Sequence, residues 1–169
     1  MITIYTDGSS RGNPGRGGYG IVLIAAHKRK ELAAAFKKTT NNRMELMAAC
    51  VALEALKIPG SKVTLVSDSK YVTEAINKKW IYGWIRKNWK DVKNPDLWQR
   101  FYKVFQQHQV SMQWIKGHNA HPENERCDVL ATYAADNGPW DTDAWFENTE
   151  CALPAGLFIR NKFSIPPMM

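Results

Sequence analysis

The short apolar run from Val63 to Val66 constrains the fold more than any other feature of this sequence. Such a run is typical of a strand buried on both faces of a sheet, and that burial requires helices on both sides. A helical pattern precedes the run: Asn41 or Asn42 can cap it, Pro59-Gly60 stops it, and its apolar positions recur at spacings of three and four. After the run, Asp68-Ser69 opens a further helix. The centre of the chain therefore predicts a helix–strand–helix unit.

The remaining segments extend this unit in both directions. Residues 2–6, 19–26 and 31–40 are β-rich; a polar hairpin at 27–30 joins the last two, and the glycine-rich residues 12–18 predict an irregular loop. One or two helices follow residue 70, the last starting at 94–96, before a strand at 110–115 and a helix at 123–135. This order predicts an α/β fold with a mixed five-stranded sheet, its first three strands antiparallel, and helices on both faces.

The 169 residues suffice for one domain, which we place at residues 1–137, followed by an extension at 138–169. We expect the extension to pack on the domain or on a partner chain, because its large apolar side chains would be costly to expose: Trp140, Trp145, Phe146, Leu157, Phe158 and Phe163. The three cysteines, at positions 50, 127 and 151, form no CxxC pair and are expected to be buried or half-buried thiols. No signal peptide or membrane span is readable, so a cytoplasmic protein is expected.

Positive charge is concentrated in one segment. The formal net charge is +7, and eight Lys and Arg residues against two Asp lie between Lys78 and Lys103, interleaved with aromatic residues. This composition favours a nucleic-acid surface on which cations neutralise phosphates and rings pack against sugar or base. The alternative is a pair of amphipathic helices whose basic face is exposed to solvent. For Trp98 and Phe101 a position in the core is preferred.

Four acids fall at the ends of predicted elements: Asp7 at the end of the first strand, Glu45 one turn into the first helix, Asp68 after the central strand and Asp128 early in the closing helix. Ligands of open α/β sheets collect at the carboxyl ends of the strands. Several carboxylates there raise one another's pKa unless divalent cations compensate their charge. Oxygen ligands suit Mg²⁺, so this arrangement indicates metal-assisted phosphodiester hydrolysis. Taken alone, Asp68 can equally be a helix cap.

Several longer sequence motifs resemble those of the bacterial type 1 ribonuclease H family. They are Tyr5-Thr6-Asp7-Gly8-Ser9, Gly12-Asn13-Pro14-Gly15, Thr39-Thr40-Asn41-Asn42-Arg43-Met44-Glu45-Leu46, Ser67-Asp68-Ser69, Lys116-Gly117-His118 and Asn124-Glu125-Arg126-Cys127-Asp128. They occur in the family's order over residues 1–137. The resemblance implies a ribonuclease H-like fold and an endonuclease that cleaves the RNA strand of RNA–DNA hybrids, leaving 5′-phosphate and 3′-hydroxyl ends.

The resemblance also implies roles for individual residues. The four acids would bind two Mg²⁺ ions, with Mn²⁺ as a substitute, and His118 would handle a proton or assist product release. A zinc site at His118 and His121 is disfavoured, because no third ligand of the usual kind accompanies them. An RNA–DNA hybrid is the implied partner, and a monomer is expected.

Substrate contacts follow from the same resemblance. Asn13, Asn41 and Glu45 would read the 2′-hydroxyl that distinguishes RNA from DNA, and Thr40 and Asn42 would hold a DNA phosphate. The basic protrusion would grip the DNA strand through Lys79, Trp80, Trp84, Arg86, Lys87, Trp89 and Lys90. Gly17 and Gly18 are expected to serve only the geometry of the hairpin. Departures from the family's pattern, such as Gly83 in place of a polar residue and Lys70 in place of Gln, leave the hybrid affinity open.

Three other functions fit the sequence less well. A hybrid-binding module without catalysis would be expected to lack one of the acids, and all four are present. A proofreading exonuclease expects an Asp-x-Glu pair on the first strand, where this chain has Asp7-Gly8-Ser9. A scaffold protein leaves both the acids and the glycine-rich segment unexplained.

Overall fold

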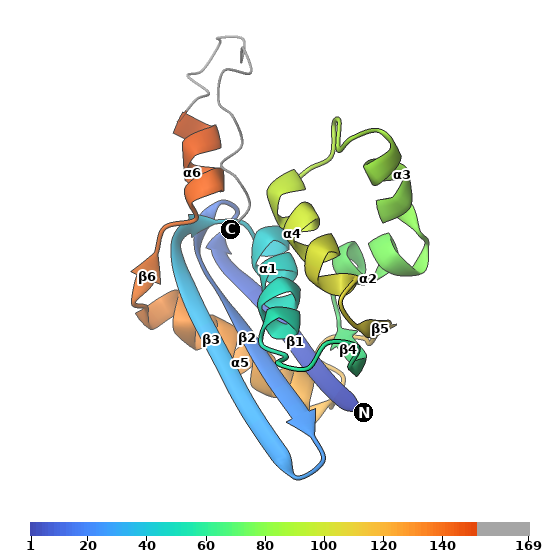
Figure 1. The fold of residues 1–169 in the computed structure, drawn as a ribbon. Coiled ribbons are helices and arrows are strands. Elements are labelled where there is room, and N and C mark those ends of the chain that lie inside the picture. Colours follow the sequence, from blue (N-terminus) through green and yellow to red (C-terminus); the bar gives the residue numbers. More distant parts are fainter. Residues whose placement is uncertain (152–169) are drawn as a thin grey trace.

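The structure, a computed structural model, describes residues 1–151 of the chain (Figure 1). The strands are β1 (Ile2–Gly12), β2 (Gly15–Ala25), β3 (Lys28–Thr39), β4 (Lys62–Ser67), β5 (Gln109–Trp114) and β6 (Trp140–Asp141). The helices are α1 (Asn41–Glu54), α2 (Lys70–Asn77), α3 (Trp80–Arg86), α4 (Pro95–Phe105), α5 (Pro122–Asn137) and α6 (Ala144–Cys151). No helix among these residues is long and apolar enough to cross a bilayer.

The six strands form one mixed sheet in the order β5-β4-β1-β2-β3-β6. β1, β2 and β3 are antiparallel neighbours, whereas β4 and β5 run parallel to β1. The predicted α/β class and the antiparallel first three strands are therefore confirmed. The short β6, which pairs in parallel with Ala35 and Phe36 of β3, adds a sixth strand to the five expected.

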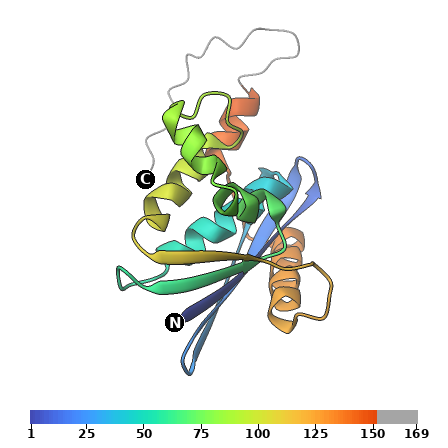
Figure 2. The ribbon, with the colours of Figure 1, turned by 90° about the vertical axis from the view of Figure 1, so that its right-hand side faces the viewer.

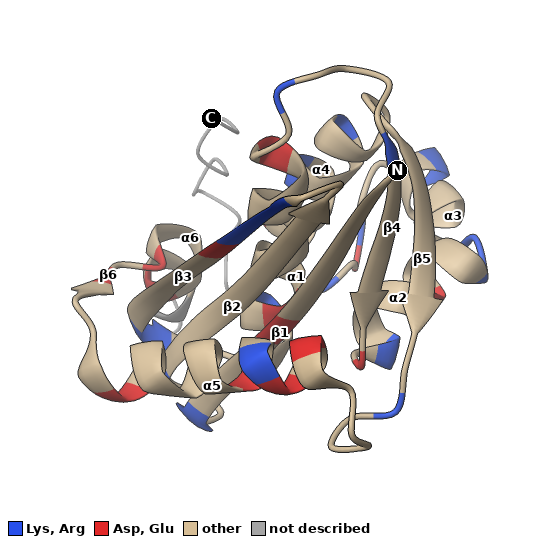
Figure 3. Ribbon diagram, turned by 90° about the horizontal axis from the view of Figure 1, so that it is seen from below, with Lys and Arg blue, Asp and Glu red and all other residues tan. Residues whose placement is uncertain are grey.

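Helices cover both faces of the sheet, unequally. Among the described residues, α5 is the only helix on one face, and α1 packs on the opposite face together with α4 (Figures 2 and 3). The main core fills the space between α1, α4 and the sheet, and its largest fully buried side chains include Trp98, Phe101, Ile4 and Ile21. The core position preferred for Trp98 and Phe101 is thus confirmed.

The glycine-rich segment is not the irregular loop that was predicted. β1 continues to Gly12 and β2 begins at Gly15, so most of these glycines lie in a β-hairpin. A Cβ atom at Gly18 would lie 2.6 Å from the carbonyl oxygen of Ala131 in α5. Gly18 is therefore required for the close approach of a helix to the strand, beyond the hairpin geometry expected for it.

The helix starts also differ in detail from the prediction. Thr40, rather than Asn41 or Asn42, caps α1, because its hydroxyl accepts a hydrogen bond from the Arg43 amide at 3.2 Å. Ser69, rather than Asp68, caps α2 in the same way. Asp68 is thereby left available for another role.

Residues 138–151 return to the sheet. The Trp140 ring lies 4.0 Å from the Arg16 guanidinium of β2, and its indole N–H donates to the Ala135 carbonyl. Cys50 and Cys127 are buried free thiols. The predictions for Leu157, Phe158, Phe163 and the Cys151 side chain lie outside what the structure describes.

Candidate active site

Strand register brings Asp7 and Asp68 together. The parallel pairing of β1 with β4 ends at Thr6 opposite Ser67, so the next residue of each strand is an aspartate at the same edge of the sheet. The prediction that Asp7 ends its strand is wrong, because β1 continues beyond it against β2. The edge is nevertheless the carboxyl end of the β1–β4 pair, where ligands of such sheets bind.

Glu45 reaches the same place from α1. A Cβ atom at Gly8 would lie 2.3 Å from the Glu45 amide nitrogen, so the backbone of α1 rests directly on β1 beside Asp7. One carboxylate oxygen from each of Asp7, Glu45 and Asp68 lies within 4.8 Å of the others. The sequence expectation that distant acids meet at one spot is confirmed for these three.

This cluster is electrostatically strained. Burial, followed by the charges of Asp68 and Asp128, raises the pKa of Asp7 to about 7. Burial and the charge of Asp7 likewise raise the pKa of Glu45 well above its ordinary value. Both residues are only 6% exposed, and the Glu45 Oε2 atom has no hydrogen-bond partner among the described residues. Without a cation, burying these carboxyls side by side lowers the free energy of unfolding.

The donor set fits a divalent cation that prefers oxygen. All three side chains offer carboxylate oxygens, one of them buried and unpaired, and their mutual repulsion is the kind that a bound cation removes. No sulfur or imidazole atom belongs to this cluster, so it resembles a Mg²⁺ or Mn²⁺ site more than a zinc site.

The backbone of Asp68 is held by β5. The Trp114 indole N–H donates to the Asp68 carbonyl oxygen at 3.0 Å, and the Lys70 ammonium lies 5.0 Å from the Trp114 ring. A Cβ atom at Gly117 would lie 2.5 Å from Asp68 Oδ2, so the loop that carries His118 borders the cluster. The His118 side chain itself is exposed.

Asp128 lies in the second turn of α5, across the sheet edge from α1, and is half-buried. It is outside the three-carboxylate group, yet its charge contributes to the raised pKa of Asp7. Figure 3 shows acidic positions in red on β1 and on the neighbouring part of α5. The structure thus places Asp128 beside the cluster rather than within it.

The residues expected to contact the hybrid fall into two groups. In the first group, the Asn13 side chain accepts a hydrogen bond from the Asn41 amide at 3.1 Å, which joins the β1–β2 hairpin to the start of α1. Asn42 is exposed beside Asn41, and the Thr40 hydroxyl is engaged as the helix cap. These four residues surround the end of α1 that carries Glu45.

The second group lies on α3 and in the residues that flank it. A shallow groove of about 410 Å³ is lined by Lys79, Trp80, Gly83, Trp84, Arg86 and Lys87. Lys90 is exposed just beyond α3, and Figure 3 shows Lys and Arg in blue along this side of the molecule. Trp84 and Trp89 are half-buried and pack against the core, whereas Trp80 is 46% exposed. Of the three tryptophans, Trp80 therefore offers the most ring surface to a ligand.

Sequence reasoning missed three residues that support the site. Trp114 holds Asp68, while Arg43 and Asp143 form a buried ion pair at the start of α1. For Arg43 a signal exists: α1 is apolar on nearly every side, which predicts burial all round, and a buried arginine requires carboxylates. Asp143 lies in a segment with no periodicity, and nothing in the sequence marks it.

Comparison with known proteins agrees with this arrangement. The family model described as RNase H matches residues 1–136. A ribonuclease H of Lachnoclostridium phytofermentans is 55% identical over 148 residues, which cover 81% of this chain and 93% of that protein.

Two solved structures are similar at 28% sequence identity. LC9-RNase H1, described as a type 1 RNase H with the type 2 active-site motif, superposes with a TM-score of 0.74 and covers 91% of this chain and 81% of its own. LC11-RNase H1, solved in complex with an RNA/DNA hybrid, has a TM-score of 0.60 and covers 80% and 97% respectively. With the family model spanning most of the chain and a relative above 50% identity, this protein belongs to the ribonuclease H family, type 1.

Proposed function

We propose that this protein is an endonuclease that hydrolyses the RNA strand of RNA–DNA hybrids and leaves 5′-phosphate and 3′-hydroxyl ends. The observation that carries the proposal is the meeting of Asp7, Glu45 and Asp68 within 4.8 Å at the carboxyl edge of the sheet. One chain would suffice for catalysis, because the three clustered acids all belong to it.

Asp7, Glu45 and Asp68, with Asp128 beside them, would hold two Mg²⁺ ions, for which Mn²⁺ can substitute. When bound, such ions neutralise charge on a scissile phosphate and lower the pKa of water to supply a nucleophile. The buried carboxyls supply rigid, preorganised ligands because β1, β4 and α1 fix their backbones. His118, exposed on its loop, can exchange a proton between the departing 3′ oxygen and solvent.

Recognition of the hybrid would use the two groups of residues around this cluster. Asn13 and Asn41, which are hydrogen-bonded to each other, would read a 2′-hydroxyl, and Thr40 and Asn42 beside them would hold a DNA phosphate. Farther along the duplex, the α3 groove with Arg86, Lys87 and Lys90 offers cations to the phosphates of the DNA strand.

The test is incubation of the protein with end-labelled RNA–DNA hybrid, duplex RNA and duplex DNA, each with Mg²⁺ or with EDTA. We expect cleavage of the RNA strand of the hybrid alone, in Mg²⁺ alone, with products whose 3′ ends a polymerase extends. Asp7→Asn should retain hybrid binding in Ca²⁺ and lose cleavage by at least about 100-fold, since even indirect supports of metal ligands cost 10–100-fold. Binding without cleavage by the wild-type protein would indicate a hybrid-binding module and refute the proposal.

A further inference from the structure

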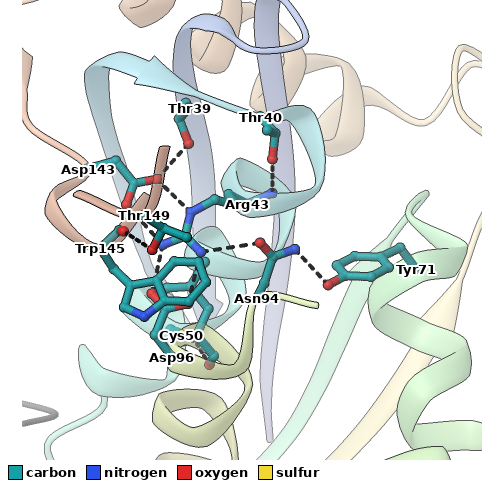
Figure 4. Close-up of polar contacts among 11 residues, drawn as sticks. Thr39, Thr40, Arg43, Cys50, Tyr71, Asn94, Asp96, Asp143, Trp145 and Thr149 are labelled. Carbon is teal, nitrogen blue, oxygen red and sulfur yellow. Dashed lines mark hydrogen bonds and ion pairs between the residues drawn. The ribbon is translucent and has the colours of Figure 1, made fainter. Parts of the chain in front are cut away.

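The most densely bonded side chain among the described residues is Arg43, in the first turn of α1. Its side chain is 1% exposed, and all five of its N–H donors have acceptors. Asp143 accepts from Nε at 2.7 Å and from Nη2 at 2.9 Å, Asp96 from Nη1 at 2.9 Å and from Nη2 at 2.7 Å, and Asn94 from Nη1 at 3.2 Å. One guanidinium thereby joins α1 to the start of α4 and to the segment between β6 and α6 (Figure 4).

Asp143 is the member of this group that comes from outside the matched family region, which ends at residue 136. Its side chain is 3% exposed, and its Oδ2 atom also accepts a hydrogen bond from the Thr39 hydroxyl at 2.7 Å. Trp145 and Phe146 lie over the guanidinium at 4.9 and 5.8 Å from their ring centroids. Figure 4 shows Thr39, Asp143 and Trp145 arranged around Arg43 at the start of α1. The Asp143 carboxylate is therefore held in one orientation by Arg43 and Thr39 together.

The position of Arg43 on α1 gives this group a functional consequence. Glu45 follows two residues later, so the two side chains leave the helix on roughly opposite sides. On the Glu45 side, the α1 backbone already rests on β1 at Gly8. Arg43 and its acceptors therefore hold the same turn from the other side. The turn begins with Asn41 and Asn42.

We propose that Asp143 is a positioning residue of the active site: through Arg43 it fixes the first turn of α1, and with it Glu45, Asn41 and Asn42. This inference rests on the proposed function of that turn. It assigns the segment that follows the family region a role in metal and hybrid binding, which Asp143 performs without touching either ligand.

A purely structural role is the competing explanation, and α1 contains a suitable control. At its other end, Glu54 forms a bidentate ion pair with Arg100 of α4, both contacts at 2.7 Å. This pair also joins α1 to α4, but it lies nine residues, or about 13 Å along the helix, from Glu45. Asp143→Asn and Glu54→Gln therefore each weaken an arginine clamp on the same helix, near to and far from the acids.

The experiment compares wild type, Asp143→Asn and Glu54→Gln at a temperature at which each is fully folded by circular dichroism. Hydrogen exchange without substrate gives the protection of the α1 amides, and hybrid cleavage gives kcat and KM separately. For Asp143→Asn we expect lost protection confined to residues 43–46, a kcat about 10-fold lower and a raised KM, as for other residues that orient metal ligands. Glu54→Gln should leave kcat, KM and the protection of residues 43–46 at wild-type values.

Thr39→Val provides a milder variant in case Asp143→Asn does not fold, because it removes only the hydroxyl that orients Asp143 and should give the same pattern at smaller amplitude. Equal kinetic effects in the Asp143 and Glu54 variants, or wild-type protection of residues 43–46 in both Asp143→Asn and Thr39→Val, would overturn the proposal. Because exchange is measured without substrate, a wild-type protein that fails to cleave hybrids would refute the proposed function and leave the exchange result readable.

Discussion

At the scale of single residues, the active site is built from groups that the fold holds under unfavourable conditions. Asp7 and Glu45 are buried side by side, and both have a pKa above the ordinary value. A carboxyl whose pKa is raised by folding binds its proton more tightly in the folded state than in the unfolded chain. The metal-free protein is therefore expected to carry a stability penalty that depends on pH.

Asp7→Asn should reveal this penalty directly. In EDTA, the wild-type protein should lose stability as the pH rises from about 4 to about 7, between the ordinary pKa of Asp7 and its folded value of about 7, and its stability should stay low above that. The variant lacks the charge, so its gain in unfolding free energy should reach a few kcal/mol at pH 8 and vanish near pH 4. Urea unfolding at several pH values measures the difference, and a gain that is independent of pH would contradict this origin.

Trp114 offers a second test at this scale. Trp114→Phe keeps a ring in place but removes the N–H that donates to the Asp68 carbonyl. Losing one such hydrogen bond costs about 1 kcal/mol, so a fall in kcat of about 5-fold is expected. Trp140→Phe is a matched control, because it removes an indole bond to the Ala135 carbonyl, remote from the acids. Its kcat should equal that of the wild type; an equal fall in both variants would show that Asp68 does not depend on Trp114.

At the scale of elements, the basic groove on α3 and the acidic edge of the sheet perform separable tasks. The groove residues contribute charge, and none of them belongs to the carboxylate cluster. Removing lysines from the groove is therefore expected to change the strength of binding and its salt dependence, while the chemistry at the bound phosphate continues.

Lys79→Ala with Lys87→Ala should lower hybrid affinity and flatten the plot of log Kd against log salt by about 0.9 for each phosphate that the protein no longer neutralises, the value for B-form duplexes. Lys28→Ala with Lys30→Ala, at the far end of the β2–β3 hairpin, removes the same charge and should leave the slope unchanged. Fluorescence anisotropy in Ca²⁺ between 50 and 200 mM salt, a range of about fourfold, measures both slopes. Equal slopes in the two double variants would place the duplex elsewhere.

Sequence patterns predicted these elements well where one physical signal dominated. The apolar run around Leu65 identified the central strand, and its parallel pairing with β1 in the structure places Asp7 and Asp68 at one edge. The patterns failed where a residue type has two uses. Gly18 fitted a loop because glycine breaks strands, whereas here it admits the backbone of α5. Arg43 was assigned no role, because its two aspartate partners are distant in sequence.

At the scale of the whole molecule, the order of strands and helices was predictable and the closing segment was not. β6 has two residues and no alternating pattern, so its pairing with β3 depends entirely on tertiary contacts, including that of Trp140 with Arg16. A periodicity cannot be detected over two residues. The same reason hides Asp143, whose partner Arg43 is 100 residues away.

Cation binding should stabilise the molecule as a whole. A ligand that binds only the folded state adds about 2.7 kcal/mol at 100 times its Kd. Mg²⁺ binds the deprotonated carboxylates, so the rise in Tm should be largest at pH 8 and shrink towards pH 5 as Asp7 takes up its proton. Differential scanning calorimetry with Mg²⁺ and with EDTA gives the shift. Asp7→Asn should show little of it, and an undiminished shift in that variant would place the cation elsewhere.

The pairing of Thr6 with Ser67 sets a limit on how this chain can change in length. Inserting or deleting one residue between Ile2 and Asp7 would turn the Asp7 side chain to the opposite face of the sheet, since side chains alternate along a strand. The turn at Ala26 and His27, at the far end of the β2–β3 hairpin, carries no such restriction. Homologous chains should therefore vary in length at that turn and keep a constant number of residues between the start of the first strand and its aspartate.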